Sequence, residues 1–144
     1  MPSISKSMRI IGRCQTLFRT EKTKGAIRDS YNSLVFTICR FPGRSQETIA
    51  KDLYFEKSSI ARILTRMEED GFVTRVPNVE DKRQLLIYPT QKLLDFLEPA
   101  TQIAKEWNAL ITEGISPEEF EIFRSVLSRI ERNAKAIIDK KGDL

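Results

Sequence analysis

Histidine is absent from the 144 residues of this chain, and cysteine occurs only twice. Without histidine, the chain has no serine-histidine triad, no imidazole acid or base, and none of the commonest metal ligands. Cys14 and Cys39 lack the spacing of a zinc site, and an isolated disulfide is unusual in a reducing compartment. We therefore expect free thiols, no metal site and no cofactor.

Long apolar runs and glycine-rich phosphate loops are missing too. No apolar stretch approaches the roughly 20 residues that cross a membrane, and Lys6 and Arg9 are not followed by the continuous apolar segment of a secretory signal. Neighbouring carboxylates occur at residues 68–69 and 118–119, but adjacent helix positions diverge by about 100°, which does not pair them for catalysis. These observations predict a cytoplasmic protein that is not an enzyme.

The most informative pattern that is present lies between Lys57 and Asp70. Apolar residues recur on one side of a helix of 3.6 residues per turn, at Ile60, Ile63, Leu64 and Met67. The other side has Ser58, Arg62, Thr65, Arg66 and Glu69. Ser58 and Ser59 lie in the first turn, where unpaired amides and short hydroxyls can reach phosphate or base edges. A recognition helix is indicated, with an ordinary amphipathic surface helix as the alternative.

The flanking segments favour the recognition helix. Upstream, Ser45 can cap a short helix that buries Ile49 and Ala50, and residues 54–56 leave only a tight turn before the next helix. Downstream, Gly71 is a natural helix stop, and residues 72–76 and 84–88 have the pattern of two strands. This order predicts a winged helix-turn-helix: a mainly α-helical fold with a small β-hairpin wing.

The connection between the two predicted strands, residues 77–83, contains turn formers and charges. We expect an exposed hairpin tip from which Lys82 and Arg83 project. Asp81 lies two residues before Arg83, so both side chains share a face of extended chain and the carboxylate can hold the guanidinium in one orientation.

In combination, these features resemble the MarR family of transcriptional regulators. The resemblance depends on Ile49-Ala50, Ser58-Ser59, Arg62, the helix end from Met67 to Gly71, Val73, the wing Asp81-Lys82-Arg83, and Thr90. It implies that the helix of residues 57–70 enters the major groove of double-stranded DNA, that Arg83 enters the adjacent minor groove, and that Asp81 orients Arg83. It covers the middle of the chain and says nothing about the operator sequence.

We expect the following DNA contacts. The major-groove candidates are Ser58, Ser59, Arg62, Thr65 and Arg66, and the wing candidates are Asp81 and Arg83. The phosphate candidates are Arg44, Lys57, Arg75 and Lys82.

Both ends of the chain have apolar helical stripes. One stripe runs from Ile4 to Phe18, a second from Leu93 to Ile111 and a third from Phe120 to Ile137. Ser116-Pro117-Glu118-Glu119 separates the last two as the start of a new helix, and Pro99 is expected to kink the second. We expect residues 1–28 and 92–144 to form a helical dimerisation region around a DNA-binding region of residues 29–91.

The resemblance to the MarR family implies a homodimer in which the first and last helices of two subunits interlock. Two recognition helices related by a two-fold axis contact half-sites roughly 34 Å apart, so the expected operator is pseudo-palindromic. The alternative is intramolecular packing of the same stripes in a monomer.

Positive charge is concentrated at the amino-terminal end. The chain has 24 Lys and Arg against 20 Asp and Glu, yet residues 1–28 hold seven basic residues and one acidic residue. Clustered positive charge attracts DNA phosphate. A solvated basic segment without a specific partner is the alternative interpretation of residues 1–28.

Cys14 is the one residue with candidate redox chemistry, because some MarR relatives sense oxidants through a cysteine in the first helix. Cys14 falls between Ile10 and Leu17 on the apolar stripe, however, where a buried thiol behaves as a small hydrophobic group. Cys39 follows Ile38 on a predicted helix and is expected in the core.

The sequence therefore favours a sequence-specific transcriptional regulator, a repressor by family analogy, that binds double-stranded DNA as a homodimer. By the same analogy, a small aromatic or anionic effector would release it from DNA. The effector would bind in a crevice formed by the first helix, the helix around residues 31–40 and the helix that begins near Leu93. Two alternatives stay open: a winged-helix module that binds another protein, and a thiol-based oxidant sensor that uses Cys14.

Overall fold

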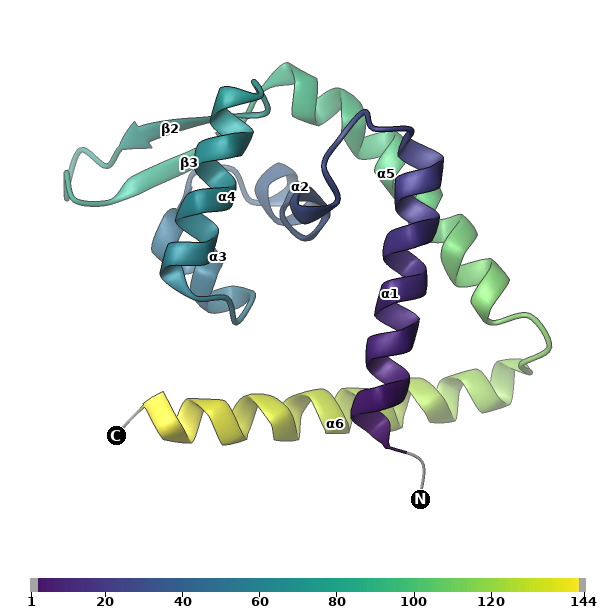
Figure 1. The fold of residues 1–144 in the computed structure, drawn as a ribbon. Coiled ribbons are helices and arrows are strands. Elements are labelled where there is room, and N and C mark those ends of the chain that lie inside the picture. Colours follow the sequence, from purple (N-terminus) through teal and green to yellow (C-terminus); the bar gives the residue numbers. More distant parts are fainter. Residues whose placement is uncertain (1–2, 143–144) are drawn as a thin grey trace. The chain divides into compact units, whose positions relative to one another are not determined.

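The computed structural model describes residues 3–142 (Figure 1). In chain order the elements are α1 (Ile4–Thr23), η1 (Asp29–Tyr31), α2 (Asn32–Arg40), β1 (Arg44–Ser45), α3 (Gln46–Asp52), α4 (Lys57–Glu69), β2 (Val73–Pro77), β3 (Leu85–Pro89), α5 (Gln91–Ile111) and α6 (Pro117–Gly142). The chain forms two compact units, residues 3–107 and residues 108–142. Within the described residues, no helix has both the length and the apolar composition needed to span a bilayer.

The predicted fold class is confirmed, since the described residues are mainly helical and contain one small antiparallel sheet of order β1-β3-β2. The hairpin of β2 and β3 places Arg75 opposite Ile87, and each strand begins and ends one residue later than predicted. The two-residue strand β1, which pairs Arg44 with Ile87, is additional to the prediction. Two residues are too few to show the alternation by which a strand is recognised.

The helix-turn-helix forms where local sequence signals place it. The Ser45 hydroxyl oxygen accepts a hydrogen bond from the Thr48 amide at 3.1 Å and so caps α3. After α4, Gly71 has a φ of 81°, the left-handed conformation that ends a helix and favours glycine. The Thr90 hydroxyl donates to the Gly71 carbonyl at 2.6 Å, which ties the end of the hairpin to the end of α4.

The hydrophobic core lies between α2, α3, α4, the sheet and the beginning of α5. Its buried residues are Ile27, Tyr31, Leu34, Val35, Ile38, Ile49, Ala50, Ile60, Leu64, Met67, Phe72, Val73, Ile87, Leu93 and Ala100. Figure 1 shows α2, α3 and α4 gathered beside the hairpin. This core holds α4 against the sheet and leaves the opposite side of α4 in solvent.

In the same unit, α1 meets the second half of α5 through a few specific contacts. The rings of Phe18 and Trp107 lie with their centroids 5.4 Å apart, and the Lys22 ammonium donates to Glu106 at 2.8 Å. None of the described residues of α1 is buried. The helix α5 continues through Pro99, so the proline does not end it.

Residues 108–142 comprise the end of α5, a turn and α6. The turn contains Gly114 with a φ of 81°. The predicted helix start is confirmed as a capping box: the Glu119 amide donates to the Ser116 hydroxyl at 3.1 Å, and the Ser116 amide donates to the Glu119 carboxylate at 2.9 Å. No described residue of α6 is buried, and its apolar side chains include Ile122 and Phe123, which are 66% and 55% exposed.

Candidate nucleic-acid interface

The helix α4 has a buried face and a free face, as its sequence pattern predicts. Ile60, Leu64 and Met67 are completely buried, whereas Arg62 and Arg66 are exposed. Ser58 is also exposed, and Ser59 is half-buried. The predicted major-groove residues therefore lie together on one side of a helix whose other side is fixed in the core.

The first turn of α4 leaves backbone donors available. Among the described residues, Glu56, which precedes the helix, makes no side-chain cap with it; the Ser59 amide donates to the Glu56 carbonyl at 3.1 Å, and the Lys57 and Ser58 amides precede the first intrahelical bond. The Thr65 hydroxyl instead donates to the Ala61 carbonyl of its own helix at 2.8 Å. Thr65 can therefore offer a DNA base only an acceptor unless this bond breaks.

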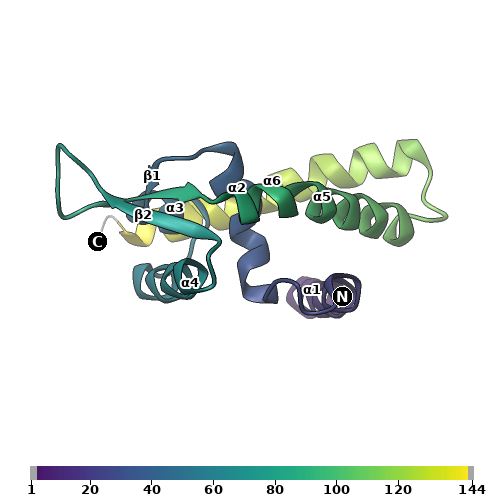
Figure 2. The same ribbon diagram turned by 90° about the horizontal axis from the view of Figure 1, so that it is seen from above.

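The wing presents Arg83 at the tip of the hairpin, which projects beyond the helices of its unit in the two views (Figures 1 and 2). The Arg83 side chain is 91% exposed. Its Nε donates to the Asp81 carboxylate at 3.1 Å, and its backbone amide donates to the same oxygen at 3.1 Å. Asp81 therefore orients Arg83 in the way that their spacing predicts, while the outer edge of the guanidinium stays available.

The four predicted phosphate residues divide into two pairs. Lys57 and Lys82 are exposed. Arg44 instead forms an ion pair with Asp52 and stacks over the Phe41 ring. Arg75 also forms an ion pair, and its side chain is less exposed than that of Arg44.

The Arg75 side chain is only 18% exposed and donates to Glu68 of α4 at 3.1 Å. This hydrogen bond lowers the pKa of the Glu68 carboxyl. The ion pair joins β2 to α4. To contact phosphate, the Arg75 guanidinium would have to bind the phosphate and Glu68 at the same time.

Cys14 is exposed on α1, so the expectation that it is buried on the apolar stripe is wrong for the protomer. The physical reason is that the described residues of α1 contribute nothing to the core. Cys39 packs against the core as predicted, and burial raises the pKa of its thiol.

Residues 32–85 match the model of the MarR family. The match extends from the beginning of α2 into β3 and therefore includes α4 and the wing. The chain contains a MarR-family domain.

Solved structures of MarR-family regulators share this fold over nearly the whole chain. The transcriptional regulator SlyA is 26% identical, with a TM-score of 0.85, and the match covers 92% of this chain and 94% of SlyA. A structure of MarR is 23% identical, with a TM-score of 0.85 and coverage of 96% and 95%. A MarR-family regulator from Listeria monocytogenes, complexed with a 26-mer DNA, is 19% identical, with a TM-score of 0.83 and coverage of 92% and 89%.

The chain also has a polar contact that the sequence patterns did not predict. The Tyr31 hydroxyl donates to the carboxylate of Asp70 at 2.6 Å, and Arg28 Nε donates to the same oxygen at 3.3 Å. Tyr31 belongs to the turn before α2, while Asp70 directly follows α4. An aromatic residue in a core pattern gave no indication that its hydroxyl reaches the end of the candidate recognition helix.

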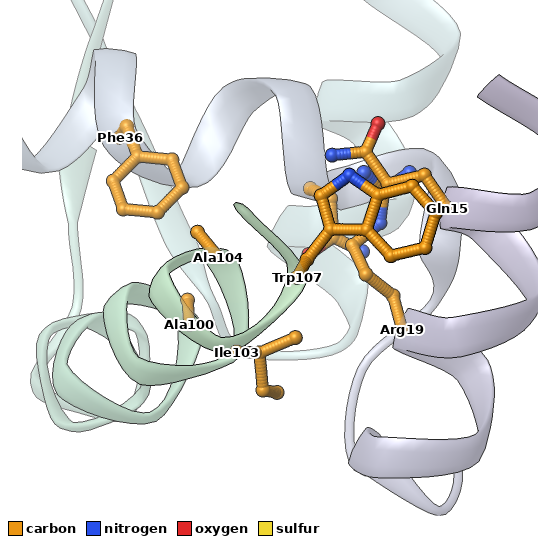
Figure 3. A pocket seen from close by; sticks show the side chains of 8 residues that line it. Gln15, Arg19, Phe36, Ala100, Ile103, Ala104 and Trp107 are labelled. Carbon is orange, nitrogen blue, oxygen red and sulfur yellow. The ribbon is translucent and has the colours of Figure 1, made fainter. Parts of the chain in front are cut away.

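A small cavity lies between α1, α2 and α5 (Figure 3). It measures about 80 Å³ and is lined by Gln15, Arg19, Asn32, Phe36, Ala100, Ile103, Ala104 and Trp107. Figure 3 shows Trp107 beside Gln15 and Arg19, with Phe36 on the other side. Arg19 Nε donates to Asp29 at 3.0 Å, so the one charged group of the lining already has a counter-ion.

We expect alkaline pH to destabilise the fold through Tyr31. Burial raises the pKa of Tyr31 from 10.0 to about 12. Because the folded-state pKa lies above the unfolded value, the stability from the neutral phenol is complete below pH 10 and is lost as pH rises toward 12.

The measurement is the urea midpoint of wild type and Tyr31→Phe between pH 8 and pH 11.5. The two proteins differ only in the Tyr31 hydroxyl, so the difference between the two curves isolates the phenol. Wild type should lose its advantage over Tyr31→Phe as pH rises. A constant difference across this range would contradict the prediction.

Proposed function

We propose that this protein is a transcriptional regulator, specifically a repressor, that binds a pseudo-palindromic operator in double-stranded DNA as a homodimer. Residues 29–91 form the DNA-binding region of each subunit. Residues 1–28 and 92–144 form the dimerisation region. In this arrangement α4 enters the major groove and the wing enters the adjacent minor groove.

The observation that carries the proposal is the Arg83 side chain, held by Asp81 at the tip of an exposed hairpin. An arginine inserted into a narrow minor groove meets an enhanced negative potential, and a fixed guanidinium loses little conformational entropy on binding. The exposed polar face of α4 provides the second contact surface. The DNA complex of a similar fold from Listeria monocytogenes supports the same partner.

The cavity beside Trp107 is the candidate effector site within this proposal. Its volume of about 80 Å³ is roughly half of the 150 Å³ that accepts a benzene molecule in a protein core. An aromatic effector must therefore separate α1 from α5 on binding. An effector that binds this opened form more tightly shifts the dimer away from the DNA-competent form.

The experiment that tests the proposed function is fluorescence anisotropy on duplexes from the upstream intergenic region of the gene and on shuffled controls, at two salt concentrations. A regulator binds one natural duplex in preference to its shuffled version, and the affinity falls steeply with salt. Absence of duplex binding at both salt concentrations by folded, dimeric protein would favour the protein-interaction module instead.

Arg62→Ala and Lys82→Ala should differ in their effect on sequence preference. Arg62 projects from the middle of the free face of α4 and is placed to contact base edges, so its loss should weaken preferred-duplex binding by about tenfold and shuffled-duplex binding much less. Lys82 is an exposed wing cation placed for phosphate, so its loss should weaken both duplexes similarly. Competition titrations with both duplexes measure the two ratios. Equal losses for Arg62→Ala on every duplex would remove Arg62 from the base-contacting residues.

A further inference from the structure

The end of α4 is fixed by a buried tyrosine from a distant part of the chain. Tyr31 is completely buried, and its ring packs edge-on against Phe72, with the ring centroids 5.8 Å apart. Its hydroxyl donates to the Asp70 carboxylate at 2.6 Å. This hydrogen bond lowers the pKa of the Asp70 carboxyl, so the acceptor is charged at neutral pH.

Asp70 is held on several sides at the point where α4 ends. The Arg28 guanidinium donates to the same carboxylate oxygen as Tyr31. The Lys92 ammonium donates to the Asp70 backbone carbonyl at 2.7 Å and lies over the Phe72 ring. Donors from the turn before α2 and from α5 therefore converge on one residue at the carboxyl end of the recognition helix.

The carboxyl end of α4 is fixed at Asp70, and one face of the helix packs against the core. A small rotation or shift of the helix is the movement that remains, and it displaces the amino-terminal end most. The α4 residues proposed to contact DNA begin at Ser58, three helical turns from Asp70. A change in the position of Asp70 therefore moves the amides and hydroxyls at the groove end of α4 relative to the wing. Base contacts tolerate such a movement less well than phosphate contacts, because bidentate pairing with a base requires a fixed geometry.

We propose that Tyr31, with Arg28, is a positioning residue for DNA recognition: by holding Asp70 it sets the orientation of α4 that reads the preferred sequence. This inference rests on the proposed DNA-binding function and deepens it. Tyr31 does not contact DNA and acts only through Asp70.

The same turn also connects α4 to α1. Asp29 directly follows Arg28, and its carboxylate accepts hydrogen bonds from Arg19 at 3.0 Å and from Asn32 at 3.3 Å. Arg19 and Asn32 both line the cavity between α1, α2 and α5. Separation of α1 from α5 pulls on Arg19, hence on Asp29, and the turn transmits this displacement to Tyr31 and Asp70. The turn is thus the physical link between the candidate effector site and the recognition helix.

The first test compares Tyr31→Phe with Tyr88→Phe on two duplexes, one selected from a randomised library by the wild-type protein and one random. Tyr31→Phe removes one hydroxyl and keeps the buried ring. Tyr88 lies on β3 with a partly exposed side chain and serves as the matched control. Tyr31→Phe should bind the selected duplex about tenfold more weakly and the random duplex less than threefold more weakly, and Tyr88→Phe should bind both as wild type does.

The ratio of the two affinities separates positioning from stability, because partial unfolding lowers binding to both duplexes equally. Arg28→Gln is the second variant, since Arg28 is 61% exposed at its side chain and its replacement leaves the core intact. Unchanged preference in folded Tyr31→Phe and Arg28→Gln proteins would overturn the positioning role. A wild-type protein that selects no duplex from the library would overturn the proposed function itself.

A double-mutant cycle tests the link to α1. If Arg19 and Tyr31 act through one turn, Arg19→Gln should itself weaken binding to the selected duplex, and Arg19→Gln with Tyr31→Phe should lose about as much affinity as the larger single loss. Lys22→Gln is the matched control, because it breaks an ion pair between α1 and α5 that does not involve the turn. In the Lys22→Gln, Tyr31→Phe double variant, the fold-losses in affinity of the two single variants should multiply. Independent, multiplied losses for Arg19 and Tyr31, or no loss for Arg19→Gln alone, would overturn the link.

Discussion

Arg83→Ala is expected to abolish most of the preference for the operator, with a loss of about 100-fold in affinity. The proposed homodimer would lose two wing arginines, and a well-placed contact of this kind is worth roughly 1–3 kcal/mol. The side chain is almost fully exposed and forms an ion pair with Asp81 of the same wing. Its removal should therefore leave the folding stability unchanged within about 0.5 kcal/mol. Anisotropy on preferred and shuffled duplexes, with a urea melt of the same samples, measures both quantities.

Two neighbouring variants give the matched controls for Arg83→Ala. Asp81→Asn keeps the size of the orienting residue but weakens its hold on the guanidinium, so it should lose less affinity than Arg83→Ala, on the preferred duplex above all. Lys82→Ala removes a wing charge without a base contact and should reduce affinity for every duplex by a similar factor. If Arg83→Ala behaves like Lys82→Ala on both duplexes, Arg83 contacts phosphate and does not enter the minor groove.

The helix-turn-helix was predictable because its determinants are local. Ser45 caps α3 through an amide three residues away, and the Gly71 conformation ends α4 at the residue where the pattern stops. The Asp81 and Arg83 pair spans only two residues, so its geometry follows from an extended backbone. Local signals of this kind need no knowledge of the tertiary fold.

The ion pairs of Arg44 and Arg75 could not be predicted from local sequence signals. Their sequence positions beside a helix and in a strand favoured phosphate contacts, but the fold places Asp52 and Glu68 within reach of them. Arg75 meets Glu68 only because β2 turns back along α4 after Gly71. An exposed cation and a paired cation have the same sequence signature until the tertiary structure is known.

The hydrogen bond between Tyr31 and Asp70 could not be predicted from the sequence either. Asp70 is 39 residues from Tyr31, and the tyrosine fits the apolar pattern of the core equally well with or without a hydroxyl partner. A buried phenol needs such a partner, because an unsatisfied hydroxyl in the core is costly. The sequence predicts that a partner exists, and only the fold identifies it.

The apolar side chains left exposed on α1 and α6 have the composition of an interface. On α1, Ile4, Met8, Ile10, Ile11 and Leu17 are each more than half exposed, and α6 exposes Ile122, Phe123, Val126, Leu127, Ile137 and Ile138. Apolar stripes of this length are rare on monomeric proteins. A second copy of the chain is the partner that the proposed function requires, because each copy contributes one recognition helix.

Ile11→Glu and Phe123→Glu are therefore expected to convert the dimer into a monomer and to lower operator affinity by roughly 100-fold. A carboxylate buried in an apolar interface is strongly disfavoured, and a monomer loses the effective concentration that links the two half-sites. Neither residue belongs to the core of the protomer, so the melting of the monomer should still be cooperative. Sedimentation measures the mass, which should fall from twice the 16.6 kDa of the protomer to that value.

Leu94→Glu, at a partly exposed position of α5, is the control and should stay dimeric. If the two α1 and α6 variants remain dimers with full operator affinity, the interface lies elsewhere.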